Sequence, residues 1–194
     1  MKKRTSSSKR KTKETSIAIE LCLDGSGKYN IRTQVPFLTH MLEQISKHSL
    51  IDLDINAKGD ADVDAHHTTE DIGITLGDAV SEALGNKKGI KRFGFAYGIM
   101  DEALARVALD FSGRPYLNFN LKFSKKRIGN FDTELVEEFF QGFSRGANMT
   151  LHIDGIKGGN THHNIEAVFK GFALALRDAL SIHGKGLPST KGRL

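Results

Sequence analysis

The 194-residue sequence contains a single cysteine, Cys22, and this scarcity excludes a disulfide framework within one chain. Disulfide-rich folds belong mostly to exported proteins, so we expect the reducing cytoplasm as the compartment and Cys22 as core filling. Long apolar runs are missing as well. Glu20 interrupts the only early run that could serve a signal peptide, and no run reaches the length of a membrane-spanning helix. The sequence therefore predicts a soluble protein that is not exported.

An excess of one charge is also absent from most of the chain. The net charge of +5 comes from residues 1–13, MKKRTSSSKRKTK, which hold seven of the 28 Lys and Arg and no acidic residue. The remainder has 21 basic against 23 acidic residues. A tail of this composition cannot bury apolar surface, so we expect residues 1–13 to be disordered, and nucleic acid is an unlikely partner despite this basic tail.

Two similar stretches with a period-two pattern stand about ninety residues apart. Large apolar side chains occupy every second position of residues 17–23, DGSGK turns, and YNIRTQ is extended again. Residues 107–111 alternate in the same way, SGRP turns, and YLNFNLKF runs back. We expect a β-hairpin in each place, because turn residues separate two strand-like runs.

The elements after each hairpin also repeat. An amphipathic helical pattern, an alternating strand and a longer amphipathic helix follow in both halves. These are PFLTHMLEQISKHS, LIDLDINA and HHTTEDIGITLGDAVSEAL, then TELVEEFFQGFSRG, MTLHIDGI and HHNIEAVFKGFALALRDALS.

A duplication of this size predicts an α+β fold of two half-domains. Each half is expected to be a small sheet plus two helices, with the helices packed together between the two sheets. We place the halves at residues 14–98 and 99–194. Residues 124–132, SKKRIGNFD, have no counterpart in the first half and are expected to form a loop.

The pattern His-His-x-x-Glu occurs twice in a chain with eight histidines, each time at the head of a longer helix. Glutamates three and four residues on share a helix face with the histidines, whereas adjacent histidines diverge by about 100° and would serve two ions better than one. Imidazole and carboxylate without thiolate suit Mn, Fe, Ni or Zn in a site with open positions. The alternative is a pair of solvent-facing helix caps, but the repetition favours metal. The candidate ligands are His66, His67, Glu70, His162, His163 and Glu166.

Alignment of the halves adds two candidate ligands. PFLTHMLEQ aligns with ELVEEFFQG, which places His40 opposite Glu138. His48 lies two turns after His40 and four residues after Gln44, so it could line the same site. His152 and His183 are expected to be structural or exposed.

Basic residues that could meet an anionic substrate are scattered rather than aligned in a nucleic-acid stripe. They are Arg92, Arg114, Lys170 and Lys191. Lys170 stands four residues after Glu166, which is consistent either with an intrahelical ion pair or with a cation beside the metal site.

Seven stretches, in this order, resemble the imidazoleglycerol-phosphate dehydratase family of histidine biosynthesis, from about residue 14 to the end. They are PFLTHMLEQISKH, HHTTEDIG, KKGIKRFG, MDEALARVALDFSGRPY, FDTELVEEFF, GGNTHHNIEAVFKGFALALR and LPSTKG. The resemblance implies two Mn²⁺ ions per active site, a small phosphorylated imidazole substrate, and a hollow homo-oligomer of cubic symmetry, a 24-mer, whose sites are completed by neighbouring subunits.

The resemblance also implies roles for particular residues. His40 joins the two motifs as a metal ligand. The phosphate is held by Arg92, Arg114, Lys170, Ser189 and Lys191. The glycerol chain and ring are surrounded by Glu14, Gln44, His48 and Asp101.

The implied reaction dehydrates D-erythro-imidazole glycerol phosphate to imidazole-acetol phosphate. Metals at the ring would favour imidazolate, which expels hydroxide and leaves an acidic C–H. Glu14 and Glu166 are the candidate proton carriers, with Asp101 as helper. A phosphoester hydrolase with two metals, and a metal-stabilised assembly protein with an RNA-binding tail, are the alternatives.

Overall fold

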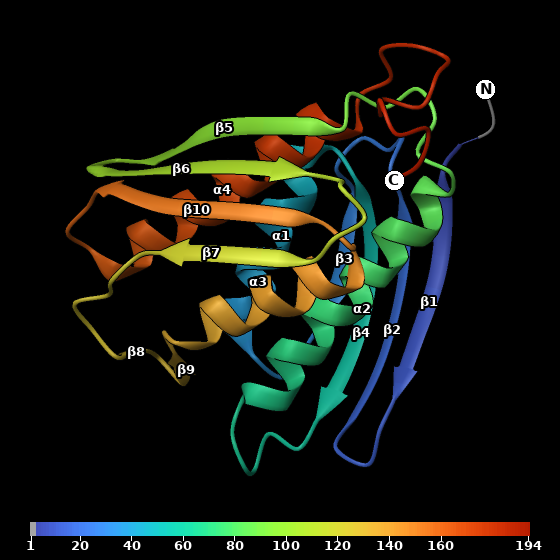
Figure 1. Ribbon diagram of the computed structural model, residues 1–194. Helices are drawn as coiled ribbons and strands as arrows, with labels where there is room; N and C mark the ends of the chain where they lie inside the picture. The colour runs from blue at the N-terminus through green and yellow to red at the C-terminus, as the bar shows by residue number, and fades with distance from the viewer. Residues whose placement is uncertain (1–2) are drawn as a thin grey trace.

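A computed structural model describes residues 3–194 and contains four helices between two four-stranded sheets (Figure 1). The prediction of an α+β fold with its helices packed together between two sheets is confirmed. The first half comprises β1 (Thr5–Lys11), β2 (Thr15–Cys22), β3 (Tyr29–Arg32), α1 (Pro36–Ser49), β4 (Asp52–Gly59) and α2 (His66–Leu84). The second comprises β5 (Phe93–Met100), β6 (Ala103–Asp110), β7 (Tyr116–Asn120), β8 (Arg127–Ile128), β9 (Phe131–Asp132), α3 (Leu135–Gly146), β10 (Thr150–Lys157) and α4 (Thr161–Leu180).

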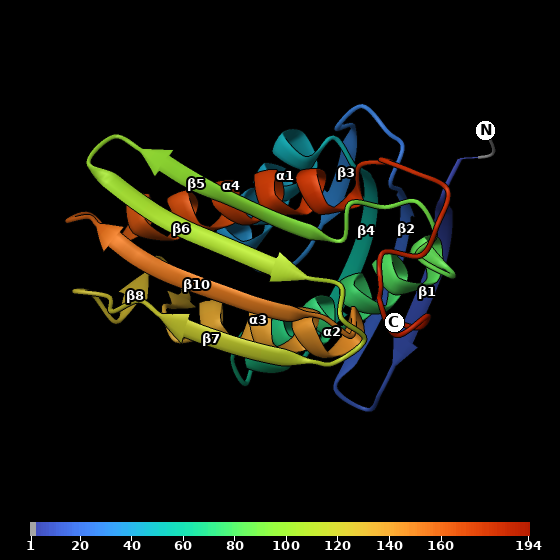
Figure 2. The same ribbon diagram turned by 45° about the horizontal axis from the view of Figure 1, so that its top comes forward.

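The two sheets have the same topology, β1-β2-β4-β3 and β5-β6-β10-β7. Figure 2 shows the second sheet as four strands side by side, with α3 and α4 behind it. The expected hairpins are wrong, because β4 lies between β2 and β3, antiparallel to one and parallel to the other. The Asp52 carboxylate at the start of β4 accepts from the backbone N–H of Ser26 and Lys28 at 2.8 and 2.9 Å. These bonds hold the loop between β2 and β3 across the end of β4. An alternating pattern identifies a strand but not its neighbour.

The expectation that residues 1–13 are disordered is also wrong for the part that the structure describes. β1 pairs antiparallel with β2 over its whole length. Its inward side chains contact α2: Ser6 donates to the Ala79 carbonyl at 2.7 Å, and Arg10 Nε donates to Asp71 Oδ1 at 2.7 Å. Polar bonds, rather than apolar burial, therefore attach this basic strand. Met1 and Lys2 lie outside the described residues.

The division between the halves precedes β5. That strand pairs with β6 and belongs to the second sheet, so the expected boundary between residues 98 and 99 cuts through it. The chain around residues 85–92 is the connection instead. The predicted loop at 124–132 is mostly irregular, with β8 and β9 forming a two-stranded ribbon in it.

The helices pack as α2 on α3 and α1 on α4, the pairing expected of a pseudo-twofold relation between the halves. Glycines allow close approach at the first crossing: a Cβ on Gly77 would lie 2.5 Å from the Phe143 carbonyl oxygen, and one on Gly146 would lie 2.3 Å from that of Ile74. One hydrophobic cluster extends through both halves. Among the described residues no helix combines the length and apolar character needed to cross a bilayer.

Arg10→Ala should lower the free energy of unfolding by about 1 to 2 kcal/mol, because it leaves the nearly buried Asp71 carboxylate without its cation. The effect is no larger because the Arg10 side chain is itself partly exposed to solvent. Urea denaturation measures the effect. Lys9→Ala, an outward-facing neighbour on the same strand, should change the stability by no more than about 0.5 kcal/mol. Equal stabilities for the two variants would mean that β1 is not held as described.

Candidate active site

Three of the predicted metal ligands come together between α1 and α4. His40 Nε2 lies 3.6 Å from Glu166 Oε2, and His162 Nε2 lies 3.3 Å from the same oxygen. The ligand atoms of these three residues all lie within 4.8 Å of one another. Phe37, on the first turn of α1, packs edge-on against the His162 ring with centroids 5.2 Å apart. The crossing of two helices from different halves therefore builds a three-donor cluster.

Charge keeps the central carboxylate of this cluster ionised. Burial raises the pKa of Glu166. The hydrogen bond that Lys170 donates to Oε1 at 2.6 Å, the charge of Lys170 and the charges of His40 and His162 together lower it by more. The result is a pKa below the usual range for Glu. Burial and the Lys170 charge also lower the pKa of His48, whose Nε2 lies 3.2 Å from Gln44 Oε1. Imidazole nitrogens beside an anionic carboxylate are a donor set that suits a divalent cation.

The two His-His-x-x-Glu motifs have the same local geometry. The ring centroids of His66 and His67 are 6.0 Å apart at 85°, and those of His162 and His163 are 6.2 Å apart at 83°. Each motif therefore points its two imidazoles in different directions, as the helical turn requires.

The imidazoles of neither motif cap the helix that the motif begins. The carboxylate of Asp64 accepts from His66 N–H at 2.7 Å, and the side chain of Asn160 accepts from His162 N–H at 2.9 Å. An Asx residue two positions before each motif thus accepts from the first backbone N–H of the motif, and in α4 that residue, Asn160, is the N-cap. No histidine ring is therefore needed to cap either helix.

The second histidine of each motif contacts a carboxylate outside its own helix. His163 Nδ1 lies 2.8 Å from Glu102 Oε2, and His67 Nδ1 lies 3.0 Å from Asp60 Oδ2. These contacts raise the pKa of both histidines, and the His163 hydrogen bond is the main reason that the pKa of Glu102 falls to about 2. Glu14, which the resemblance implied beside the substrate, lies 3.9 Å from His67 Nδ1.

Sequence reasoning missed Glu102 and Asp60. Asp101, which is expected near the site, occupies the β5–β6 turn with a φ of 48°, and its neighbour Glu102 makes the contact with His163. Short polar side chains tolerate this left-handed conformation better than most. The only available signal was the position of an acidic pair in a tight turn between two strands.

The other predicted ligands lie apart from the three-donor cluster. His66 and Glu70 begin α2, where Glu70 Oε1 lies 3.5 Å from Arg145 Nη1 of α3. Glu138 is half-buried on the first turn of α3. Across residues 3–194, the only group of three or more such donors within reach of one ion is His40, His162 and Glu166. One chain therefore brings together three donors for one ion, whereas its remaining candidate ligands are not grouped around a second ion.

The basic residues expected to hold phosphate divide between two places. Arg92, just before β5, donates to both Asp110 oxygens, from Nε at 2.6 Å and from Nη2 at 3.0 Å. Its Nη1 donates to the Pro188 carbonyl at 2.8 Å, which draws the C-terminal segment with Ser189 and Lys191 towards it.

Arg114 belongs to the same end of the sheet, because a Cβ on its neighbour Gly113 would lie 2.8 Å from the carbonyl carbon of Leu194. Lys170 stands at the other end, with Nζ 3.4 Å from Met100 Sδ. Between Arg92 and Met100 runs the whole of β5, a span of roughly 26 Å at about 3.3 Å per residue. Figure 1 shows both ends of this strand, with the C-terminus near its start.

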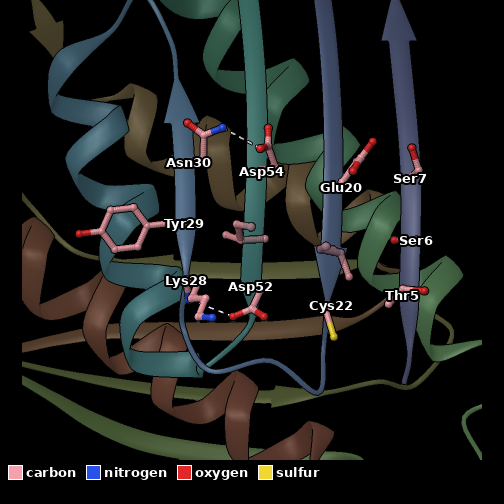
Figure 3. Close-up of a pocket in the computed structure, with 12 residues that line it drawn as sticks. Thr5, Ser6, Ser7, Glu20, Cys22, Lys28, Tyr29, Asn30, Asp52 and Asp54 are labelled. Atoms are coloured by element: carbon pink, nitrogen blue, oxygen red, sulfur yellow. Dashed lines mark hydrogen bonds between the residues drawn. The ribbon is translucent and has the colours of Figure 1, made fainter. Parts of the chain in front are cut away.

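A hollow of about 730 Å³ on the outer face of the first sheet lies away from all of these residues. It is shallow, with Glu20, Asn30 and Asp54 among its lining residues, and Asn30 Nδ2 donates to Asp54 Oδ2 at 2.7 Å (Figure 3). The histidine motifs contribute nothing to it. The donor chemistry, rather than concavity, identifies the candidate site.

Comparisons with known proteins identify the family of the chain. The family model of imidazoleglycerol-phosphate dehydratase matches residues 33–176. The chain belongs to the imidazoleglycerol-phosphate dehydratase family. It is 55% identical to the enzyme of that name from Bordetella avium (strain 197N) over 98% of this chain and 100% of the relative. It is 56% identical to the one from Hahella chejuensis (strain KCTC 2396) over 95% of both chains.

Solved structures of the family superpose closely on the fold. The crystal structure of the enzyme from Staphylococcus aureus subsp. aureus N315 matches with a TM-score of 0.83 at 47% identity, covering 92% of this chain and 99% of that one. The enzyme from Pyrococcus furiosus, in complex with (S)-C348, matches with a TM-score of 0.84 at 40% identity, covering 96% and 99%. The family resemblance inferred from seven sequence stretches is thereby confirmed, and membership makes the chain a hydro-lyase of histidine biosynthesis.

Proposed function

We propose that the chain dehydrates D-erythro-imidazole glycerol phosphate to imidazole-acetol phosphate at a site that holds two Mn²⁺ ions and is shared between copies of the chain. Family membership supports the reaction and the substrate. The observation that carries the two-ion site is the splay of each motif. His162 joins His40 and Glu166, while its neighbour His163 points towards Glu102.

The donor set fits Mn²⁺. Imidazole nitrogens and carboxylate oxygens, without thiolate, are ligands that this ion accepts in sites with open positions. His40, His162 and Glu166 would hold one ion in part, and His163 would serve the other through Nε2. The corresponding donors of the first half are His66, His67, Glu70 and Glu138.

Manganese bound by these donors would act as a Lewis acid that eases deprotonation of the substrate imidazole. The reaction breaks the C–OH bond next to the ring and a C–H bond on the adjacent carbon, releases water, and leaves an enol that becomes the ketone. Glu14 is exposed and free to accept the C–H proton. Glu166 is occupied, because Lys170 holds one oxygen and two imidazoles face the other, so we assign it to metal binding. Asp101 stands on the turn beside His163, where it could assist the proton transfer.

The substrate would extend from the metal donors to the phosphate residues, passing Gln44 and His48. Lys170 lies beside the metal donors, whereas Arg92, Arg114, Ser189 and Lys191 lie at the other end of β5, roughly 26 Å away. One small substrate can meet both groups only if a neighbouring copy supplies one of them. This distance supports a homo-oligomer, for which the family resemblance implies 24 chains.

The function is tested by incubating the protein with imidazole glycerol phosphate and Mn²⁺ and following the ketone by absorbance and mass. Phosphate should stay esterified in the product. Release of inorganic phosphate without ketone would instead indicate a phosphoester hydrolase.

The double variant His162→Ala, His163→Ala should lose both turnover and bound manganese, since it removes one donor from each ion. It should stay folded, because both rings are half-exposed and lie outside the core. Elemental analysis after gel filtration measures the metal content. His152→Ala, an exposed histidine on β10, is the matched control and should keep both properties. A double variant with full metal content would contradict the two-ion site.

Chelation should give a smaller, inactive species, and added Mn²⁺ should restore both size and rate. A ligand at about a hundred times its dissociation constant stabilises the bound form by roughly 2.7 kcal/mol per site. Where the site is shared between chains, the same free energy stabilises their association. Light scattering in dilute solution reports the mass. Metal-free protein that keeps its full assembly mass would count against metal-coupled assembly.

A further inference from the structure

The second histidine of each motif is held by a carboxylate that the motif does not contain. Glu102 comes from the β5–β6 turn and reaches His163 Nδ1 at 2.8 Å; Asp60 follows β4 and reaches His67 Nδ1 at 3.0 Å. Both distances fit a charge-assisted hydrogen bond. A repeated contact of this kind, made from two different parts of the fold, points to a shared purpose.

The pseudo-symmetry makes this repetition informative. Glu14, near the β1–β2 turn, is the positional counterpart of Glu102, yet it stands 3.9 Å from His67 Nδ1 and is too far to form a hydrogen bond. The first half uses Asp60 in its place. The histidine contact is thus retained although the element that supplies it has changed, and Glu14 is left free.

The contact decides which ring nitrogen carries the proton. An ionised carboxylate can only accept, so Nδ1 must donate, and the lone pair of a neutral ring then lies on Nε2. Metal-binding imidazoles in proteins commonly donate their other nitrogen to a carboxylate, which fixes the ring orientation. His163 and His67 therefore each present Nε2 away from their carboxylate.

The two carboxylates are not held equally well. Glu102 uses both oxygens, because Oε1 accepts from Asn160 N–H at 2.8 Å while Asn160 caps α4 at His162 N–H. Asp60 Oδ1 is buried and has no hydrogen-bond partner among residues 3–194. The ring of His163 is consequently tied to the first turn of its helix more firmly than that of His67.

We propose that Glu102 and Asp60 are positioning residues that fix the Nδ1–H tautomer and the direction of His163 and His67, so that Nε2 of each can bind a metal ion. This inference rests on the proposed metal site. It adds two residues outside the motifs, and it predicts that the Glu102 contact matters more than the Asp60 contact.

The tautomer is measured without metal, by ¹⁵N NMR of the histidine rings at a pH where they are neutral. Wild-type His163 and His67 should be Nδ1–H. Glu102→Ala should shift His163 towards the Nε2–H form, and Asp60→Ala should do the same for His67. Glu14→Gln is the discriminating variant and should leave His67 unchanged. Unshifted rings in both alanine variants would overturn the proposal, even if the protein binds manganese.

Metal affinity provides the second readout, by calorimetric titration of metal-free protein with Mn²⁺. Glu102→Ala should weaken binding by about 10- to 100-fold, as loss of such a partner typically does. Glu102→Gln, which keeps an oxygen acceptor for His163, should lose less, whereas Glu20→Gln, an exposed glutamate on the first sheet, should lose nothing. Wild-type affinity in Glu102→Ala would also overturn the proposal. Failure of the wild type to bind Mn²⁺ would refute the proposed metal site instead, and the NMR result would stand separately.

Discussion

Side chains one residue apart on an α-helix point about 100° apart, and this constraint shapes the whole site. Two adjacent histidines are poorly placed to face one small ion, so each motif serves two directions. In the second half, His162 turns towards α1 and meets His40, while His163 turns towards the β5–β6 hairpin and meets Glu102. The structure around the start of each helix must then place a partner residue in the direction of each of the two histidines.

The packing of the two halves supplies one of these directions. His40 can reach His162 only because α1 and α4 lie side by side, and that pairing follows from helices enclosed between two sheets. Small residues permit the necessary closeness on the sheet side as well. A Cβ on Gly98 of β5 would lie 1.8 Å from the Ala167 carbonyl oxygen of α4, so glycine is required there. The sheet supplies the other direction, since the β5–β6 turn overhangs the start of α4 and carries Glu102.

The helices could be predicted from the sequence, and two of them were predicted to the residue, because their apolar faces repeat every three to four positions. β1 was missed because its inward positions hold Ser6, Ser8 and Arg10, which attach by hydrogen bonds rather than by apolar burial. β5 was missed because its inward residues are mainly glycine and alanine while its aromatic side chains face outward. The motif histidines were evident from their spacing. Their carboxylate partners were not, since Glu102 is 61 residues from His163 and only the fold brings them together.

The central claim is that one substrate is held by the metal end of one chain and the phosphate end of another, and subunit complementation tests it most directly. One variant would carry His162→Ala with His163→Ala, and the second would carry Arg114→Ala with Lys191→Ala. Each alone should be inactive. If sites are shared, dissociating the two by chelation, mixing them and reassembling with Mn²⁺ should restore dehydration at the sites that combine two intact ends. Mixed assemblies that contain both variants and stay inactive would show that each chain builds its own site, and would contradict the account.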